Sequence, residues 1–250
     1  MVAGFLIAGI LFNMHYQYSY EKDYLSEFTD SGEALEKLET GVDRAVLSTD
    51  DPSVYRYDQM DTNSSENSSM QMGTNSTAYY FSVASSSIAN FFDEMYLNTP
   101  WEQHYNNLDG RTILDRLASV KYFVVKKGKE SDLPYGYSRL SGEAEKNGKT
   151  YLAYADEDAL PLGYTYDSWI SREDYDKMTV TEKQQALLQG VVLDDSSLPE
   201  TETHFNDREV SYYTSEGKGC RLKNGKVVVT QENAQLKLVF KGEEKMRRHI

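Results

Sequence analysis

The stretch Arg111–Lys127, RTILDRLASVKYFVVKK, decides the fold of this 250-residue chain. Thr112, followed three residues later by Asp115, has the spacing of a capping box, which predicts that a short helix begins here. Val120–Val125 is almost uninterrupted by polar residues and is rich in β-branched and aromatic side chains. Such a run predicts a strand covered on both faces. The stretch therefore predicts a helix that leads into the central strand of a core.

Turn and capping signals extend this core toward the C-terminus. Asn147-Gly148 and Asn224-Gly225 each separate two strand-like runs, which predicts two hairpins with two-residue loops. Two further capping boxes are predicted at Ser171–Asp174 and Thr179–Glu182, and each would begin a helix.

On the N-terminal side, the sequence predicts an amphipathic helix over roughly residues 32–47 and strands at Val54–Asp58 and Ala78–Val83. Ser85–Ser87 then precedes apolar residues at helical spacing, which predicts a capped helix with one buried stripe. That stripe consists of Ile88, Phe91, Phe92, Met95 and Tyr96.

The first 20 residues are predicted to be the end of a membrane helix and a tether. Val2–Phe12 is uncharged and apolar, but it is shorter than the roughly 20 residues that a membrane span needs. The segment that follows is acidic, so we expect it to face outward, although acidic residues are weak evidence of orientation. The alternative is that Met1–Phe12 forms a buried helix of a soluble protein.

The fold class predicted for the whole chain is α+β. Residues 21–195 are expected to form a mixed α/β extracellular domain, and the polar stretch Asp194–Asn206 to act as a linker. Residues 196–250 carry only strand signals, and they predict an incomplete antiparallel β-sandwich of jelly-roll type, a truncated β-rich domain.

Composition excludes several classes of function. A net charge of −14 makes nucleic acid an unsuitable partner, because phosphate contacts require clustered Lys and Arg. One cysteine allows no internal disulfide, and the four histidines lack zinc-ligand spacing. No nucleophile elbow, phosphate-binding glycine loop or HExxH motif occurs. The sequence therefore predicts no catalytic residue, no metal and no cofactor.

One segment has the residue types of a sugar site. Tyr164, Tyr166, Asp167 and Trp169 bring aromatic rings, which stack on sugar faces, close to a carboxylate, which accepts hydrogen bonds from hydroxyl groups. Trp101, in a loop before the central helix, offers another ring of this kind. The alternative interpretation of residues 164–169 is a strand with alternate residues buried.

The order of motifs resembles that of the YfhO family of bacterial membrane proteins. The resemblance covers most of residues 52–240 and rests on PSVYRY, AYYFSVASSSIANFF, DGRTILDRLASVKYFVV, ALPLGYTYDSWIS and EKQQALLQGVVLDD. It implies a long extracellular segment of a multi-span glycosyltransferase that uses lipid-linked sugars and modifies cell-envelope polymers such as lipoteichoic acid. The family's catalytic acid is expected in an early outer loop, and no position here corresponds to that loop.

Three functions remain open at this stage. The chain is either the extracellular part of such a membrane glycosyltransferase, inactive alone, or a non-enzymatic envelope module that binds glycans or a partner protein, or a soluble intracellular domain. The first interpretation places it at the bacterial cell membrane, with a cell-envelope glycan or a lipid-linked sugar as partner through the parent protein.

Overall fold

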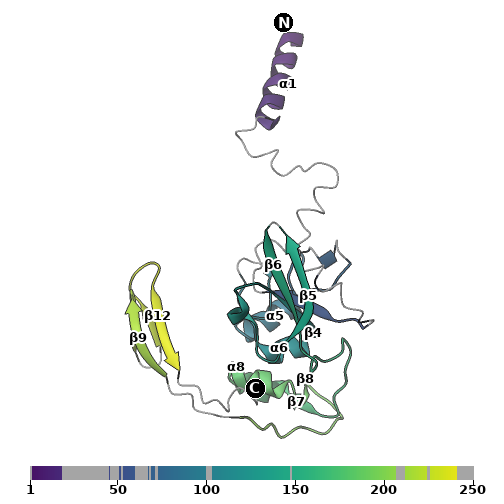
Figure 1. Ribbon diagram of the computed structural model, residues 1–250, viewed down its shortest axis with the longest axis vertical. Helices are drawn as coiled ribbons and strands as arrows, with labels where there is room; N and C mark the ends of the chain where they lie inside the picture. Colours follow the sequence, from purple (N-terminus) through teal and green to yellow (C-terminus); the bar gives the residue numbers. More distant parts are fainter. Residues whose placement is uncertain are drawn as a thin grey trace.

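The computed structural model describes residues 2–18, 45, 51, 53–59, 67, 69–70, 73–99, 103–146, 148–206, 212–223 and 226–240. These residues form helices and several small sheets, so the predicted α+β class is confirmed (Figure 1). The predicted helix over residues 32–47 lies outside the described residues, except for the helical Ala45, which is 2% exposed.

A four-stranded sheet forms the centre of the molecule. Its strand order is β1-β4-β6-β5, in which β1 is parallel to β4 and the other pairs are antiparallel. The strands are β1 (Arg56–Gln59), β4 (Val120–Lys126), β6 (Lys149–Ala155) and β5 (Ser138–Lys146). Strand β4 lies between two neighbours and is buried over most of its length, which confirms the predicted central strand.

The two faces of this sheet carry different side chains. The face that we call the helix face belongs to a large apolar cluster to which the sheet contributes Val120, Phe123, Val125, Leu152 and Tyr154. The opposite face, which we call the alanine face, contributes Tyr57, Tyr122, Val124, Ala144, Ala153 and Ala155 to a smaller cluster. Alternate residues of a strand point to opposite faces, so the single run predicted from sequence supplies both clusters.

Strand β4 has one extra residue near its start. Arg56 of β1 is paired with Val120, but the next residue, Tyr57, is paired with Tyr122. Lys121 is therefore the additional residue of a β-bulge. The bulge allows Val120 to join the helix-face cluster together with Phe123.

The predicted helix before β4 is present, but its predicted capping box is wrong. Helix α6 (Thr112–Leu117) begins after Arg111, and no side chain caps it. The Thr112 hydroxyl instead donates to the carbonyl of Tyr135 at 2.7 Å, and Asp115 is fully buried. Tertiary contacts of these two residues thus replace the local pairing that their spacing suggests.

Helix α5 (Ser86–Glu94) confirms the helix predicted after Ser85–Ser87, but no serine side chain caps it and only part of its stripe is buried. Phe92 and Met95 are in the core, whereas Ile88 is 37% and Tyr96 78% exposed. Tyr96 has left the helix with a positive φ of 47°, which carries its side chain away from the stripe. Nearby, β2 (Tyr79–Tyr80) and β3 (His104–Tyr105) form a short antiparallel pair.

A second small α/β unit follows the sheet. It contains β7 (Trp169–Ser171), α7 (Arg172–Lys177), α8 (Val180–Ala186) and β8 (Val191–Leu193), with β7 parallel to β8. The reciprocal capping box at Thr179 and Glu182 is confirmed. At α7 only one half is present: the Ser171 hydroxyl accepts from the Asp174 backbone N–H.

The predicted linker is partly attached to this unit. The Trp169 backbone N–H donates to the Pro199 carbonyl at 3.0 Å, and Thr201 N–H donates to the Trp169 carbonyl at 2.7 Å. Further along, the backbone N–H of His204 donates to the Gln189 side chain. The end of the polar stretch therefore packs beside β7 and α8.

The C-terminal strands pair in two antiparallel sets. They are β10 (Cys220–Lys223) with β11 (Lys226–Val229), and β9 (Tyr212–Lys218) with β12 (Gln235–Phe240). Pairing of Lys223 with Lys226, and of Lys146 with Lys149, confirms both predicted hairpins. The assignment of these strands to an incomplete β-sandwich domain stays a prediction.

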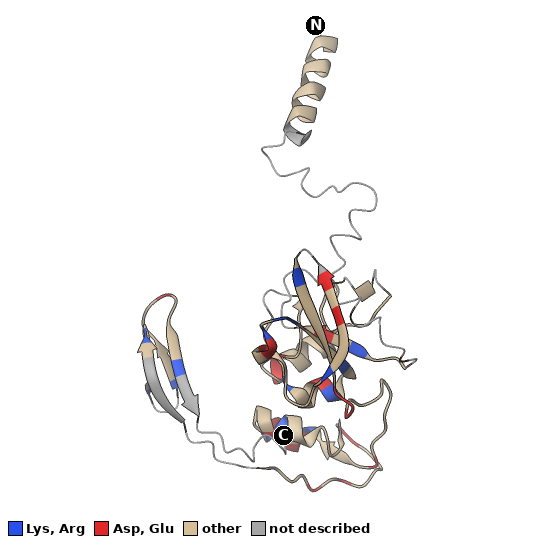
Figure 2. Ribbon diagram, viewed as in Figure 1, with Lys and Arg blue, Asp and Glu red and all other residues tan. Residues whose placement is uncertain are grey.

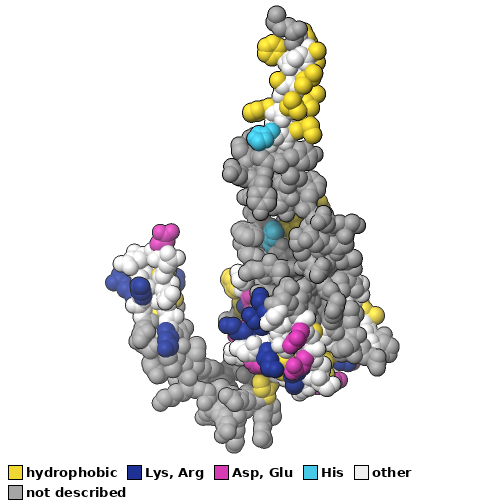
Figure 3. Space-filling view, turned by 45° about the horizontal axis from the view of Figure 1, so that its top comes forward, with side chains coloured by type: hydrophobic (Ala, Val, Ile, Leu, Met, Phe, Trp, Pro, Cys, Tyr) yellow, Lys and Arg dark blue, Asp and Glu magenta, His cyan; other side chains and the backbone are white. Residues whose placement is uncertain are grey.

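Helix α1 (Val2–Tyr18) is apolar and exposed. Its large hydrophobic side chains have 53–76% of their surface exposed, and Figure 3 shows them along the helix. Within the part of the chain that the structure describes, no helix combines the length and the apolarity required to cross a membrane.

Candidate functional site

A pocket of about 340 Å³ lies where the parallel strands β1 and β4 reach their carboxyl ends. The register pairs Gln59 with Val124 and Lys126 with Tyr151, so these four side chains share the alanine face. We call this hollow the lysine pocket. Its lining consists of Gln59, Val124, Val125, Lys126, Lys129, Asp132 and Tyr151.

Small side chains lie beside the pocket on the alanine face, although none of them is part of its lining. Ala153 is paired with Val124, and Ala144 with Tyr151, at the same end of the sheet. A methyl group fills far less space above a strand than the aromatic and leucine side chains of the other face do.

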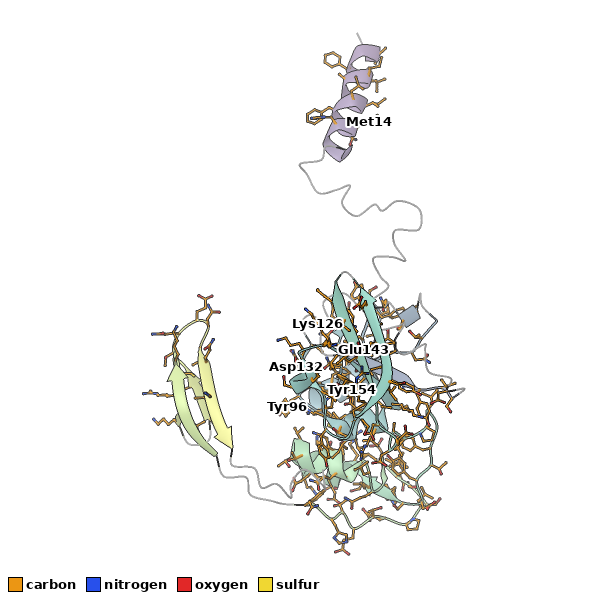
Figure 4. All side chains as sticks on the ribbon, in the orientation of Figure 1. Met14, Tyr96, Lys126, Asp132, Glu143 and Tyr154 are labelled. Atoms are coloured by element: carbon orange, nitrogen blue, oxygen red, sulfur yellow. The ribbon has the colours of Figure 1, made fainter. Side chains whose placement is uncertain are left out.

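A tight turn after β4 supplies the rim. Gly128 has a φ of +87°, which favours glycine, and the Lys129 N–H donates to the Lys126 carbonyl at 2.9 Å. The turn leads into the 3₁₀ helix η2 (Glu130–Asp132), which contacts β4. Lys126 and Asp132 are both labelled in Figure 4, toward the end of the sheet where β5 and β6 are joined.

The lysines at the pocket differ in whether they have a carboxylate partner. Among the described residues, no carboxylate lies within ion-pair distance of Lys126 or Lys129. Lys127, between them in sequence, instead has its ammonium 3.8 Å from Glu143. Elsewhere basic and acidic residues are interspersed (Figure 2). Two ammonium groups in one depression favour an anionic ligand.

The polar side chains of the pocket can bind a polar ligand. The lining offers two ammonium groups, a carboxylate, an amide and a phenol, but no histidine, serine or cysteine. Lysine amines donate hydrogen bonds, and the Asp132 carboxylate accepts them.

Three carboxylates are buried beneath the helix face. Asp58 and Asp115 are 0% exposed and Asp156 is 2% exposed. Asp58 accepts hydrogen bonds from the Thr77 hydroxyl and the Gln59 N–H, and burial raises its pKa to about 7. Burial, together with the negative charges of Asp58 and Asp156, holds the pKa of Asp115 well above its usual range.

Asp156 differs from the other two because it has a cationic partner. Arg116 Nε and Nη2 donate to its two oxygens at 2.6 and 3.2 Å. Gly136, at φ +97°, passes close by, and a Cβ there would lie 3.1 Å from the Arg116 side chain. Asp115, by contrast, has no hydrogen-bond partner for either oxygen within the described structure. These acids are enclosed, so they act on stability rather than on a surface ligand.

The predicted sugar-binding segment lies at the opposite end of β4 from the lysine pocket. The Tyr164 hydroxyl donates to the Leu117 carbonyl at 3.3 Å, and the Tyr166 hydroxyl to the Leu187 carbonyl at 2.5 Å. Their rings meet edge to face at 5.5 Å. Both phenols thus satisfy carbonyl groups at the ends of α6 and α8, which is a structural role.

The remaining predicted site residues are not gathered around one hollow. Asp167 is exposed, and Trp169 is half-buried in β7, paired with Val191. Trp101 lies outside the described residues. Glycan binding by these five residues stays a prediction, and no group of three potential metal ligands occurs in the described part of the chain.

Sequence reasoning did not identify the lysine pocket. The signal that was available is Lys126-Lys127-Gly128-Lys129, which places three lysines within four residues of a chain whose net charge is −14. The contributions of Gln59 and Tyr151 depend on strand pairing, which the local sequence does not indicate.

Comparison with known proteins adds a family. The family described as "Bacterial membrane protein YfhO" matches residues 2–248. The uncharacterized protein YfhO of Bacillus subtilis (strain 168) is 25% identical over 245 residues, which cover 93% of this chain and 27% of the relative. The chain thus spans about a quarter of that relative's length. No solved structure matches the chain.

Proposed function

The chain belongs to the YfhO family of bacterial membrane proteins, and from this premise we propose that it is the extracellular domain of a multi-span glycosyltransferase. In this proposal the parent protein transfers sugars from lipid-linked donors to cell-envelope polymers of the lipoteichoic acid type. The family match over residues 2–248 is the observation that carries the proposal.

The domain's part in this activity is binding rather than bond making. The lysine pocket supplies groups that hold a charged, hydroxyl-rich ligand. The enclosed carboxylates are 0–2% exposed and do not reach a surface ligand. Both features support a domain that positions an acceptor for a catalytic centre elsewhere in the parent protein.

The activity is tested in the bacterium that carries the gene. We expect deletion of the parent gene to lower the ratio of sugar to phosphate in purified lipoteichoic acid, and the intact gene to restore it. A parent gene lacking the codons for residues 51–206 should fail to restore it although the protein reaches the membrane. An unchanged ratio in the deletion strain contradicts the proposal.

The extracellular placement requires its own measurement. Ser131 lies in η2 and is exposed, so a Ser131→Cys variant presents a thiol on the domain surface. A membrane-impermeant maleimide should label this variant in cells whose wall has been removed and whose membrane is intact. Because Cys220 is a native thiol, the wild-type protein is the control. Labelling that occurs only after lysis contradicts the placement.

A non-enzymatic envelope module is the second candidate, and the binding character of the lysine pocket is the observation that favours it. The two candidates differ in a single result. A transferase changes the sugar content of the polymer when the gene is deleted, whereas a binding module leaves that content unchanged and alters only retention of the protein on the polymer.

A further inference from the structure

We propose that the lysine pocket binds a polyol phosphate or sugar phosphate, in which Lys126 and Lys129 hold the phosphate and Gln59, Asp132 and Tyr151 contact neighbouring hydroxyls. The inference deepens the proposed function and rests on it for the source of the phosphate. That source is the repeating unit of an anionic envelope polymer rather than a lipid headgroup.

The pairing of the lysines is the first argument. Lys121 is 2.8 Å from Asp51, and Lys177 is 3.0 Å from both Glu173 and Asp174. Neutralised lysines of this kind are expected in a chain with net charge −14, which repels anions at long range. Lys126 and Lys129, like several other described lysines, lack such a carboxylate in the described structure, but these two line the same hollow.

The other lining groups select among anions. A site for a bare anion has no use for the Asp132 carboxylate, which would repel it. A ligand that carries hydroxyl groups beside its phosphate satisfies both kinds of group, because Asp132 accepts hydrogen bonds from the hydroxyls while the ammonium groups donate to the phosphate.

Size and shape agree with one repeating unit. The volume of about 340 Å³ is at the lower end of the range for small-molecule sites. Val124 is 1% and Gln59 5% exposed, so the floor is held by the sheet. The lysines stand at the rim, on β4 and on the turn that follows it. One repeating unit of a polymer can therefore occupy the pocket, while the rest of the polymer remains outside it.

Binding is measured on the 250-residue chain, with detergent present to cover α1. The probe is glycerophosphoglycerol, with glycerol as the uncharged comparison, and the readout is NMR chemical shift. We expect localised shifts at Gln59, Tyr151 and residues 126–132 with the phosphate probe only. Lys129→Gln and Lys126→Gln should each weaken binding about tenfold, because each removes a charge-assisted hydrogen bond.

Lys127→Gln is the matched control. It makes the same change of charge in the same turn, but its ammonium faces Glu143 instead of the pocket. We expect it to weaken binding by less than about twofold. Equal losses in Lys127→Gln and Lys129→Gln would mean attraction to a charged segment and would overturn the proposal, as would the absence of localised shifts.

A vesicle arm separates the two sources of phosphate. Both the wild-type chain and the Lys129→Gln chain contain the apolar helix α1. Phosphatidylglycerol vesicles should therefore retain the two chains equally. Release of Lys129→Gln alone would assign the pocket to a lipid headgroup and overturn the polymer source. Phosphate binding in a parent protein that transfers no sugar would refute the proposed function and leave the pocket's assignment standing.

Discussion

The two faces of the central sheet solve the same packing problem with different side chains. The helix face buries the Phe123 ring and the Leu114 side chain of α6, and it carries the enclosed carboxylates. The alanine face buries three alanines and keeps its charged contacts near the surface, as in the Lys121–Asp51 pair. The helix face is filled by large side chains, whereas the lysine pocket is lined mainly by residues of the other face.

This difference shows where stability and binding are located. Large buried side chains contribute the most to the free energy of unfolding, and they leave no room for a ligand. Small ones contribute less and permit a hollow beside a rigid strand. Four substitutions test this contrast, beginning with the largest expected effect.

Phe123→Ala should cost about 3–5 kcal/mol of unfolding free energy, because it opens a cavity in the larger cluster. Val124→Ala, one residue later on the alanine face, is the matched comparison and should cost less. Urea unfolding followed by circular dichroism measures both. Equal costs would show that the faces do not differ in packing.

Asp58→Asn tests the buried acids. Because the folded-state pKa of Asp58 is raised to about 7 from 3.8, the folded state binds this proton more tightly than the unfolded state does. Below about pH 4 the carboxyl is protonated in both states and does not lower the free energy of unfolding. As pH rises toward 7, the free energy of unfolding falls, by at most about 4 kcal/mol. The raised pKa of Asp115 acts in the same direction.

Asparagine reproduces the shape of the neutral acid, so the stability of Asp58→Asn should fall less between pH 5 and pH 7.5 than that of the wild type. The variant should therefore gain stability relative to the wild type at pH 7.5. Unfolding free energies of the variant and the wild type at both pH values give the comparison, and their difference cancels the other titrating groups. A variant that keeps the wild-type slope would show that the pKa of Asp58 is not raised in the fold, so that this carboxyl is already ionised at pH 5.

Ala153→Leu examines the other face by adding volume. Ala153 is fully buried in β6 opposite Val124, and the larger side chain should cost about 1–3 kcal/mol through overpacking. Because Ala153 is paired with Val124, which lines the lysine pocket, displacement of Val124 should also weaken binding of glycerophosphoglycerol. Thermal unfolding and the NMR titration provide the two readouts, and unchanged values in both would place the free space elsewhere.

Tyr122→Phe has the smallest expected effect, about 0.5–1.5 kcal/mol. It removes the hydrogen bond that the Tyr122 hydroxyl donates to Asp51 at 2.6 Å. The Lys121 ammonium, 2.8 Å from the same carboxylate oxygen, remains. A cost similar to that of Phe123→Ala would contradict a peripheral role for this contact.

The sequence predicted elements that depend on local patterns. The apolar run of β4, the two Asn-Gly hairpins and the Thr179 cap each require only neighbouring residues, and all were confirmed. The capping box at Thr112 was wrong because Tyr135, distant in sequence, offers the hydroxyl a better acceptor. A pattern of residue types cannot register that competition.

The candidate site was not predictable in the same way. The lysine pocket requires Gln59 of β1 and Tyr151 of β6 to lie next to β4, one on each side of it. This arrangement follows from the strand order. Conversely, Tyr164 and Tyr166 have the composition of a sugar site, but their hydroxyls hold helix ends. Composition indicates which groups are present, and topology decides which of them share a surface.

The turn that follows β4 has a consequence for how this family can diversify. Lys129 and Asp132 lie on an exposed turn and a short 3₁₀ helix, outside the buried sheet. Substitutions there alter the charge of the pocket rim while the strands below keep their packing. A few substitutions of surface residues can therefore change the ligand preference of the pocket, without any compensating change in the core.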